Sequence, residues 1–259
     1  MSEVIVIKSG KGGVGKTTTT ANIGAALALS GKKVLMIDTD IGLRNLDVIM
    51  GLENRIVYDL VDVVENKCTY TKALVRDKRF DGLFLLPAAQ SRDKSAVTTT
   101  QMKHLVRQMQ DDFDYILIDC PAGIEQGFEN AVAAAKKAIV VAMPEVSSVR
   151  DADRIIGLLE KHDIKDIRLV INKLRPKMVE KGSMLGIEDM LEILAIDLLG
   201  VVPDDEDIII AANNGEYVSA TVKSIAGQAY RNIASRLNGN DVELVELHQS
   251  FLKRLFKRK

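Results

Sequence analysis

Short apolar segments rich in β-branched residues recur along the chain, and we interpret most of them as buried strands. They occupy residues 4–7, 34–37, 83–86, 115–118, 138–142, 167–171 and 198–202. Between them, apolar residues follow helical spacing over residues 17–29, 101–111, 125–135, 149–160 and 183–194. Because parallel neighbours need crossover connections, this alternation predicts an α/β fold, a mostly parallel sheet with helices on both faces. Ligands of such sheets bind beyond the carboxyl ends of the strands.

Composition agrees with one large globular domain. The chain has 259 residues, of which 47% are hydrophobic and 27% charged, and this excludes collagen-like, disulfide-scaffold and disordered classes. No linker or internal repeat interrupts residues 1–237, residues 238–242 form a polar break, and residues 243–259 are a separate segment. We expect a cytoplasmic protein, because the sequence starts without a signal-peptide pattern and no segment has the ~20 apolar residues of a membrane-spanning helix.

A phosphate-binding loop follows the first predicted strand and opens the first predicted helix. Residues 10–17 read GKGGVGKT and fit the pattern G-x-x-x-x-G-K-[ST]. Glycines allow backbone N–H groups to turn toward phosphate oxygens, and the N-terminus of the following helix adds a partial positive charge. In such a loop Lys16 reaches the β- and γ-phosphates, and the Thr17 hydroxyl coordinates Mg²⁺.

A dinucleotide-binding loop is the competing interpretation, because residues 10–15 also satisfy G-x-G-x-x-G. Asp38, at the end of the second predicted strand, stands where such a protein places its ribose-binding acid. Two features favour a nucleoside triphosphate instead. One is the Lys-Thr pair directly after the last glycine, and the other is Asp119, which ends a predicted strand where a Walker B acid would hold Mg²⁺.

Four sequence motifs together resemble those of a known family. KGGVGKT at residues 11–17 has a second lysine early in the loop, as deviant Walker A loops do, and DTDIGLRNLD, DCPAG and PEVSSVRD follow at residues 38–47, 119–123 and 144–151. The chain resembles the ParA/MinD family of deviant Walker A ATPases, and its MinD members most, over nearly its whole length. The resemblance implies a P-loop NTPase fold of the SIMIBI type. The loop alone is shared with partition ATPases, flagellar-number ATPases and nitrogenase iron protein, so DIGLRNLD and the basic C-terminal segment carry the sharper match.

The resemblance also implies roles for individual residues. In catalysis, Lys16 would bind phosphate in cis, Lys11 would reach across a dimer interface to the partner's nucleotide, and Asp40 would orient the attacking water. Mg²⁺ and its waters would be held by Thr17, Asp38 and Asp119. The nucleotide would be contacted in the loop by Gly10, Lys11, Gly12, Gly13, Val14, Gly15, Lys16, Thr17 and Thr18, at the γ-phosphate by Gly123, and at the base by Asn172 and Pro203.

Three of these residues have simpler interpretations. In the functional interpretation of Lys11, a lysine delivered by a neighbouring subunit stabilises the charge that develops on the outer phosphate oxygens, and hydrolysis would then be coupled to dimerisation. The alternative for Lys11 is a solvated loop lysine. For Asp38 and Asp40 the alternative is capping of the turn beyond the strand, since an acid there often accepts hydrogen bonds from backbone N–H groups.

Residues 243–259 form a basic, amphipathic segment. Five of the 35 basic residues lie within residues 250–259, which hold no acid, and this leaves 30 basic against 36 acidic residues in the rest of the chain. A helix with bulky apolar residues opposite basic ones suits the interface of an anionic membrane. A last helix docked on the domain and a nucleic-acid-binding tail are the alternatives. The residues expected to enter the membrane interface are Phe251, Leu252, Lys253, Arg254, Leu255 and Phe256.

The function implied by the resemblance is Mg²⁺-dependent ATP hydrolysis in the selection of the division site. The protein would form a homodimer with ATP, bind anionic lipid as a peripheral protein on the cytoplasmic face of the cell membrane, and recruit the division inhibitor MinC. MinE, or another topological factor such as DivIVA, would set its distribution, and no specific nucleic acid is expected. A ParA-like partition ATPase and a MinD-like regulator of flagellar number stay open as alternatives. ATP-dependent DNA binding that survives removal of residues 243–259 would favour the partition ATPase.

Overall fold

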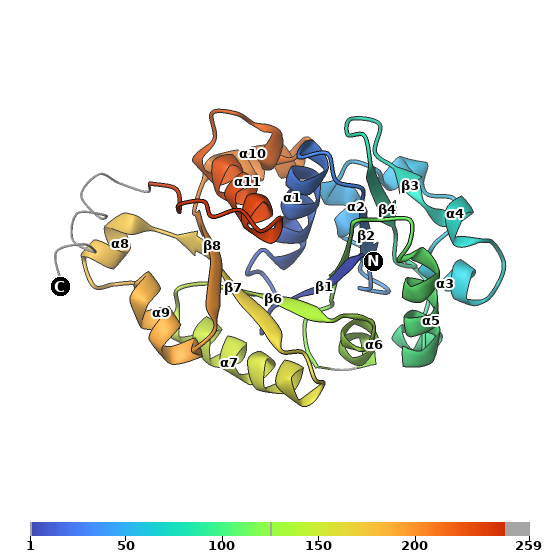
Figure 1. Cartoon of the computed structure of the whole chain (residues 1–259), viewed down its shortest axis with the longest axis horizontal. Coiled ribbons are helices and arrows are strands. Elements are labelled where there is room, and N and C mark those ends of the chain that lie inside the picture. The colour runs from blue at the N-terminus through green and yellow to red at the C-terminus, as the bar shows by residue number, and fades with distance from the viewer. Residues whose placement is uncertain (1, 125, 247–259) are drawn as a thin grey trace.

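The computed structural model describes residues 2–124 and 126–246, and this part of the chain contains an eight-stranded sheet (Figure 1). The strand order is β3-β4-β2-β5-β1-β6-β7-β8. All neighbouring strands are parallel except β3 and β4. The strands are β1 (Glu3–Lys8), β2 (Val34–Asp38), β3 (Val75–Arg76), β4 (Leu83–Leu86), β5 (Tyr115–Asp119), β6 (Lys137–Ala142), β7 (Asp166–Leu174) and β8 (Asp197–Pro203).

The seven predicted strands are all present, and the mostly parallel sheet is confirmed. The apolar pattern does not predict β3, because a two-residue antiparallel edge strand is too short to show a period. β7 extends to Leu174, three residues beyond its predicted end at residue 171. This extension carries Asn172 and Lys173 toward the phosphate loop.

The five predicted helices are also present, on both faces of the sheet (Figure 1). They correspond to α1 (Lys16–Leu29), α5 (Thr99–Met109), α6 (Gln126–Ala134), α7 (Val146–Lys161) and α9 (Ile187–Leu194). α9 begins four residues later than expected from the pattern. Its start is fixed where the Asp189 carboxylate accepts the N–H of Gly186 at 2.7 Å, which satisfies a backbone donor at the helix N-terminus.

Six further α-helices lie in the described residues, together with the 3₁₀ helices η1 (Glu53–Arg55), η2 (Lys94–Ala96) and η3 (Val218–Ala220). The α-helices are α2 (Leu46–Ile49), α3 (Leu60–Val64), α4 (Tyr70–Ala73), α8 (Pro176–Glu180), α10 (Glu206–Asn213) and α11 (Ile225–Leu237). Most of them are too short for a helical period to be recognised. α11 is longer, but small residues such as Ala226, Gly227, Ala229 and Ala234 occupy much of its buried face, so its apolar pattern is weak.

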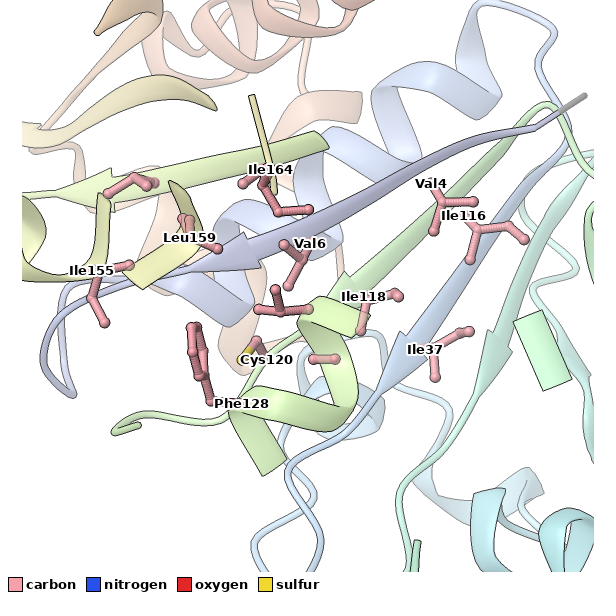
Figure 2. Close-up of a cluster of buried hydrophobic side chains, with 14 of the residues drawn as sticks. Val4, Val6, Ile37, Ile116, Ile118, Cys120, Phe128, Ile155, Leu159 and Ile164 are labelled. Atoms are coloured by element: carbon pink, nitrogen blue, oxygen red, sulfur yellow. The ribbon is translucent and has the colours of Figure 1, made fainter. Parts of the chain in front are cut away.

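Alternating side chains of β1 divide the core into two layers. Val4 and Val6 pack in one layer with α5, α6 and α7, whereas Ile5 and Ile7 pack in the other with α1 and α11. Figure 2 shows the first layer, in which Val6 lies near Ile118 of β5 and Leu159 of α7. The sheet is therefore covered on both faces, and its polar ligands must approach from a strand end.

The chain beyond α11 turns back along that helix. The side chains of Asn232 and Arg236 donate to the carbonyl oxygens of Glu243 and Val242 at 2.9 and 2.8 Å. Residues 243–246, the first four of the segment predicted to be amphipathic, have no helical structure. The predicted membrane residues 251–256 lie outside the described residues. Within the described part, every helix is too short or too polar to cross a membrane.

Candidate active site

The phosphate loop connects the end of β1 to the start of α1, at the carboxyl ends of the central strands. Gly13 and Gly15 adopt φ angles of 80° and 89°, which L side chains rarely adopt. At Gly15 a Cβ would also lie 2.3 Å from Nδ2 of Asn172. The loop therefore needs glycine at this position for two reasons, backbone conformation and space.

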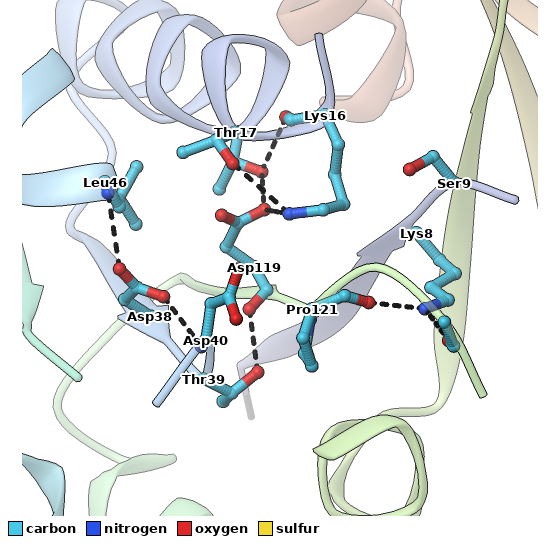
Figure 3. Close-up of polar contacts among 12 residues, drawn as sticks. Lys8, Ser9, Lys16, Thr17, Asp38, Thr39, Asp40, Leu46, Asp119 and Pro121 are labelled. Carbon is cyan, nitrogen blue, oxygen red and sulfur yellow. Dashed lines mark hydrogen bonds and ion pairs between the residues drawn. The ribbon is translucent and has the colours of Figure 1, made fainter. Parts of the chain in front are cut away.

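Lys16, which is predicted to bind phosphate, and Asp119, which is predicted to support the metal, form a buried ion pair (Figure 3). Lys16 Nζ lies 2.7 Å from Asp119 Oδ1, and the two residues are 7% and 1% exposed. Burial alone lowers the pKa of Lys16, but the charge of Asp119 and its hydrogen bond outweigh burial and raise that pKa. Thr20, one turn into α1, donates to the same carboxylate oxygen at 3.0 Å. Lys16 also lies 3.2 Å from the Thr17 hydroxyl.

Asp38 caps the turn after β2, which was the alternative to its metal role. Its carboxylate accepts the N–H of Asp40 at 2.9 Å and the N–H of Leu46 at 3.3 Å. Asp38 is 1% exposed and directly faces Asp119 in the register of β2 and β5. Burial and then the charge of Asp119 raise the pKa of Asp38 to about 7. The metal role of Asp38 stays a prediction, and its capping of the turn does not exclude that role.

Asp40 begins the loop that leads from β2 to α2. Its carbonyl oxygen accepts the N–H groups of Leu43 and Arg44, at 3.2 and 3.0 Å. Figure 3 shows the Asp40 side chain beside Asp38 and Asp119, at the carboxyl ends of β2 and β5. Further along, Arg44 Nε lies 2.7 Å from Asp47 Oδ2, and the Asp47 side chain is fully buried. The sequence pattern does not predict this ion pair.

The Lys11 side chain points to the start of α7. Its Nζ lies 3.3 Å from Glu145 Oε2 and 3.0 Å from Ser147 Oγ, at the start of α7. The pair is partly exposed, so it contributes little to stability. The Lys11 side chain is partly exposed, and its action on a partner's nucleotide stays a prediction.

The predicted base-binding residues lie at the ends of β7 and β8. Asn172 is 3% exposed, and its Nδ2 donates to the carbonyl of Val14 in the phosphate loop at 2.8 Å. Its Oδ1 is buried without a hydrogen-bond partner among the described residues, and an adenine amino group would satisfy this acceptor. Lys173 Nζ donates to the carbonyl of Gly13 at 2.9 Å, and Pro203 pairs with Leu174 at the end of β8.

The turn beyond β5 contains Gly123, the predicted γ-phosphate sensor. Gly123 has a φ of 92°, and it is exposed. Behind this turn lies Lys8, the last residue of β1, whose Nζ donates to the carbonyl oxygens of Pro121 and Gly123. Lys8 is not among the predicted site residues. The available signal was a lysine directly after an otherwise apolar strand, VIVIK.

Known proteins match this chain over most of its length. Residues 5–218 match the family described as CobQ/CobB/MinD/ParA nucleotide binding domain. The septum site-determining protein MinD of Synechocystis sp. is 56% identical over 262 residues, which covers 100% of this chain and 98% of the relative. The MinC:MinD cell division protein complex of Aquifex aeolicus contains a chain 49% identical to this one, with a TM-score of 0.89 and coverage of 95% and 99%.

A nucleotide-bound structure is also similar. The MinD of Pyrococcus horikoshii, complexed with Mg-ADP, is 28% identical to this chain, with a TM-score of 0.83 and coverage of 92% of this chain and 96% of that one. The fold and the phosphate loop define a P-loop nucleotide-binding ATPase. Within that class, the chain belongs to the MinD family of septum site-determining proteins.

Proposed function

We propose that two copies of this chain pair around Mg-ATP, bind the inner leaflet of the cell membrane through their C-terminal segments, and separate after hydrolysis. The observation that carries the proposal is the buried pair of Lys16 and Asp119 beneath the phosphate loop. A lysine and an acid at these two positions are the groups that a P-loop ATPase needs for phosphate and metal.

The residues of one chain would divide the work of binding and hydrolysis. Mg²⁺ supplies charge neutralisation on the phosphate oxygens when it is bound. Thr17 would ligate it directly, and Asp38 and Asp119 would hold its waters. Lys16 would exchange its contact with Asp119 for the phosphates. Asp40 lies at the same strand ends and would orient the attacking water.

The base would be held at the ends of β7 and β8. Asn172 would accept from the adenine amino group through its unpartnered Oδ1, and Pro203 would flank the base. Thr18 would lie near the α-phosphate and Gly123 near the γ-phosphate. Because Asn172 also supports Val14, base recognition and the shape of the phosphate loop are linked.

Pairing of two chains would bring Lys11 of each copy to the other copy's nucleotide. Lys11 would have to leave Glu145 and Ser147 to do this. The contact to be broken is a partly exposed ion pair, whose strength is typically below ~1 kcal/mol. The cost is small compared with the stabilisation that a cation gives to a phosphoryl transition state.

Dimerisation would also control residence on the membrane. Basic residues near an anionic leaflet contribute ~1 kcal/mol each, and partial insertion of four to six large apolar side chains adds ~4 to 10 kcal/mol. Ordering of ten or more residues costs ~1 to 2 kcal/mol apiece and offsets most of this gain. One segment 243–259 therefore binds only marginally. Two segments on a dimer make the second insertion intramolecular, and this raises avidity by a factor of ~10² to 10⁴.

The proposed partner of the membrane-bound dimer is the division inhibitor MinC. The similar chain from Aquifex aeolicus forms a complex with MinC, and it covers 95% of this chain. We further propose that MinE, or a topological factor such as DivIVA, sets the distribution of the protein. No specific nucleic acid is part of this proposal.

Sedimentation with anionic vesicles tests the proposal. The full chain should sediment with vesicles in ATP or a non-hydrolysable analogue and stay in the supernatant in ADP. A chain that ends at Asp241 should stay in the supernatant in every nucleotide. Vesicle binding that ignores the nucleotide would contradict the proposal, and ATP-dependent binding of duplex DNA by the truncated chain would support a partition ATPase instead.

A further inference from the structure

Lys8 is a buried lysine at the end of β1 that the proposed chemistry does not use. The residue is 0% exposed. Because side chains alternate along a strand, Lys8 lies on the same face of β1 as Val4 and Val6. Burial is the main cause that lowers the pKa of Lys8, with a smaller contribution from the charge of Lys16. Burial of an ammonium costs free energy unless hydrogen bonds satisfy it.

The contacts of Lys8 all lead to the segment that follows Asp119. Nζ donates to the carbonyl of Pro121 at 2.5 Å and to the carbonyl of Gly123 (Figure 3). It also lies 5.2 Å from the centroid of the Phe128 ring, in the first turns of α6. Carbonyl oxygens and an aromatic face are both good acceptors for a cation. One ammonium thus contacts both the beginning of this segment and the helix at its end.

The other side of the same turn is exposed. Ala122, Gly123 and Ile124 are exposed, whereas Pro121 is buried. The backbone of β1 is joined to this turn as well, since the N–H of Cys120 donates to the carbonyl of Ile7 at 3.2 Å. Lys8 stands two residues before Gly10, where the phosphate loop begins. It therefore ties the base of the phosphate loop to the turn that contains Gly123.

We propose that Lys8 is a positioning residue, which holds the turn at residues 121–124 in place for a γ-phosphate. Without Lys8, the carbonyls of Pro121 and Gly123 lose a charged donor, and the turn must be ordered when the triphosphate binds. The free energy needed to order the turn is then subtracted from the binding free energy, and this reduces the affinity for triphosphate. Affinity for diphosphate is unaffected, since a diphosphate has no group at Gly123. This inference rests on the γ-phosphate role proposed for Gly123.

A comparison of two nucleotides in one variant tests the inference. Lys8→Met keeps the length and the apolar stem of the side chain but removes the donors. We expect its Kd for ADP to stay within about twofold of the parent value, and its Kd for a non-hydrolysable ATP analogue to rise about tenfold, the size expected for loss of a charged hydrogen bond. Titration calorimetry on the full chain gives both constants. Equal losses for the two nucleotides, or no loss for either, would overturn the inference.

Two further variants separate positioning from general stability. Lys137→Met removes a half-buried lysine that pairs with Glu3 and Asp166 at the other end of the strands. The ratio of its Kd for the ATP analogue to its Kd for ADP should equal that of the parent. Lys8→Gln keeps N–H donors without charge and should recover part of the lost selectivity. If Lys8→Met does not fold, Lys8→Gln carries the same comparison. Failure of the parent chain to bind nucleotide would contradict the proposed function itself, whereas normal binding with unchanged selectivity in the variants would contradict only the role of Lys8.

Exchange of backbone amides gives an independent measurement. In the ADP-bound state, the amides of Ala122, Gly123 and Ile124 should exchange faster in Lys8→Met than in the parent chain, while those of β1 and β5 should not change. Uniformly faster exchange throughout the sheet would indicate a purely structural role. Unchanged exchange in the turn would show that Lys8 does not hold it.

Discussion

Lys16 Nζ lies 2.7 Å from Asp119 Oδ1, and both groups are almost completely buried. Each group is a direct counter-charge for the other. Because a buried ion is costly without its partner, removal of either one destabilises the domain. A bound triphosphate with its Mg²⁺ offers both groups new partners, so nucleotide binding exchanges one set of ionic contacts for another.

Asp119→Asn should therefore lower the free energy of unfolding of the nucleotide-free protein by about 3 kcal/mol, because it leaves the Lys16 ammonium buried without a counter-charge. Urea unfolding at pH 7 measures this loss. Thr20→Val is the matched control, since it leaves the ion pair in place and removes only the hydroxyl that donates to the same carboxylate and to the Lys16 carbonyl; it should cost about 1.5 kcal/mol. Equal losses in the two variants would contradict the importance of the ion pair.

Asp40→Ala should bind ATP with nearly the parent affinity but hydrolyse it at least ~100-fold more slowly, because the group that orients the attacking water is lost. Phosphate release and nucleotide titration measure the two properties separately. Lys16→Ala serves as the contrasting variant and should bind nucleotide poorly. Normal turnover by Asp40→Ala would remove Asp40 from the hydrolytic mechanism.

Asp38 should make stability depend on pH near neutrality. Burial and the charge of Asp119 raise the pKa of Asp38 from its ordinary value of 3.8 to about 7, so the folded state holds a proton that the unfolded state releases. The stability that this proton contributes is present below the unfolded pKa and is lost as pH rises through 7. Asp38→Asn should abolish this dependence. Between pH 5 and pH 8 the parent should lose unfolding free energy relative to Asp38→Asn. A difference between the two proteins that stays constant over this range would contradict the raised pKa.

Gly15→Ala should separate backbone strain from loss of space. An alanine at a φ of 89° is strained by about 1 kcal/mol or more, and its Cβ would lie 2.3 Å from Asn172 Nδ2. Gly31→Ala is a matched control, because Gly31 has a φ of 84° and its Cβ would have open space around it. Thermal unfolding should show the backbone strain in both variants and a larger loss in Gly15→Ala, whose Cβ also displaces Asn172. Only Gly15→Ala should lose nucleotide affinity, and equal affinities in the two variants would contradict the role of the Gly15–Asn172 approach.

Much of this fold follows from local sequence. Seven strands and the phosphate loop are evident because strands buried on both faces are continuously apolar and because the loop needs glycines in a fixed pattern. The pairings across the sheet do not follow from local sequence. Lys8 meets Pro121 and Gly123 only because β1 lies between β5 and β6, and nothing within β1 specifies that order. The contact of Asp47 with Arg44 is local, because the two residues are three positions apart. The burial of Asp47 does not follow from local sequence, since a polar stretch gives no sign of what covers it.

The capping of the turn by Asp38 illustrates a different limit. The sequence predicts an acid at a strand end, and it leaves backbone capping open as an alternative to metal support. Only the folded structure distinguishes a carboxylate whose two oxygens each accept a backbone N–H group from one that faces solvent. The contact of Lys11 with Glu145 is similar, because both motifs are visible in the sequence and their proximity is not.

The most direct test of the account is the mass of the particle in solution. Asp40→Ala, which should retain ATP, should elute with the mass of two chains in ATP and of one chain in ADP, as measured by light scattering during size-exclusion chromatography. Lys11→Ala added to this variant should weaken the dimer, since it removes the lysine proposed to reach the partner's nucleotide. A single-chain mass for Asp40→Ala under saturating Mg-ATP would contradict the claim that ATP joins two copies of this protein.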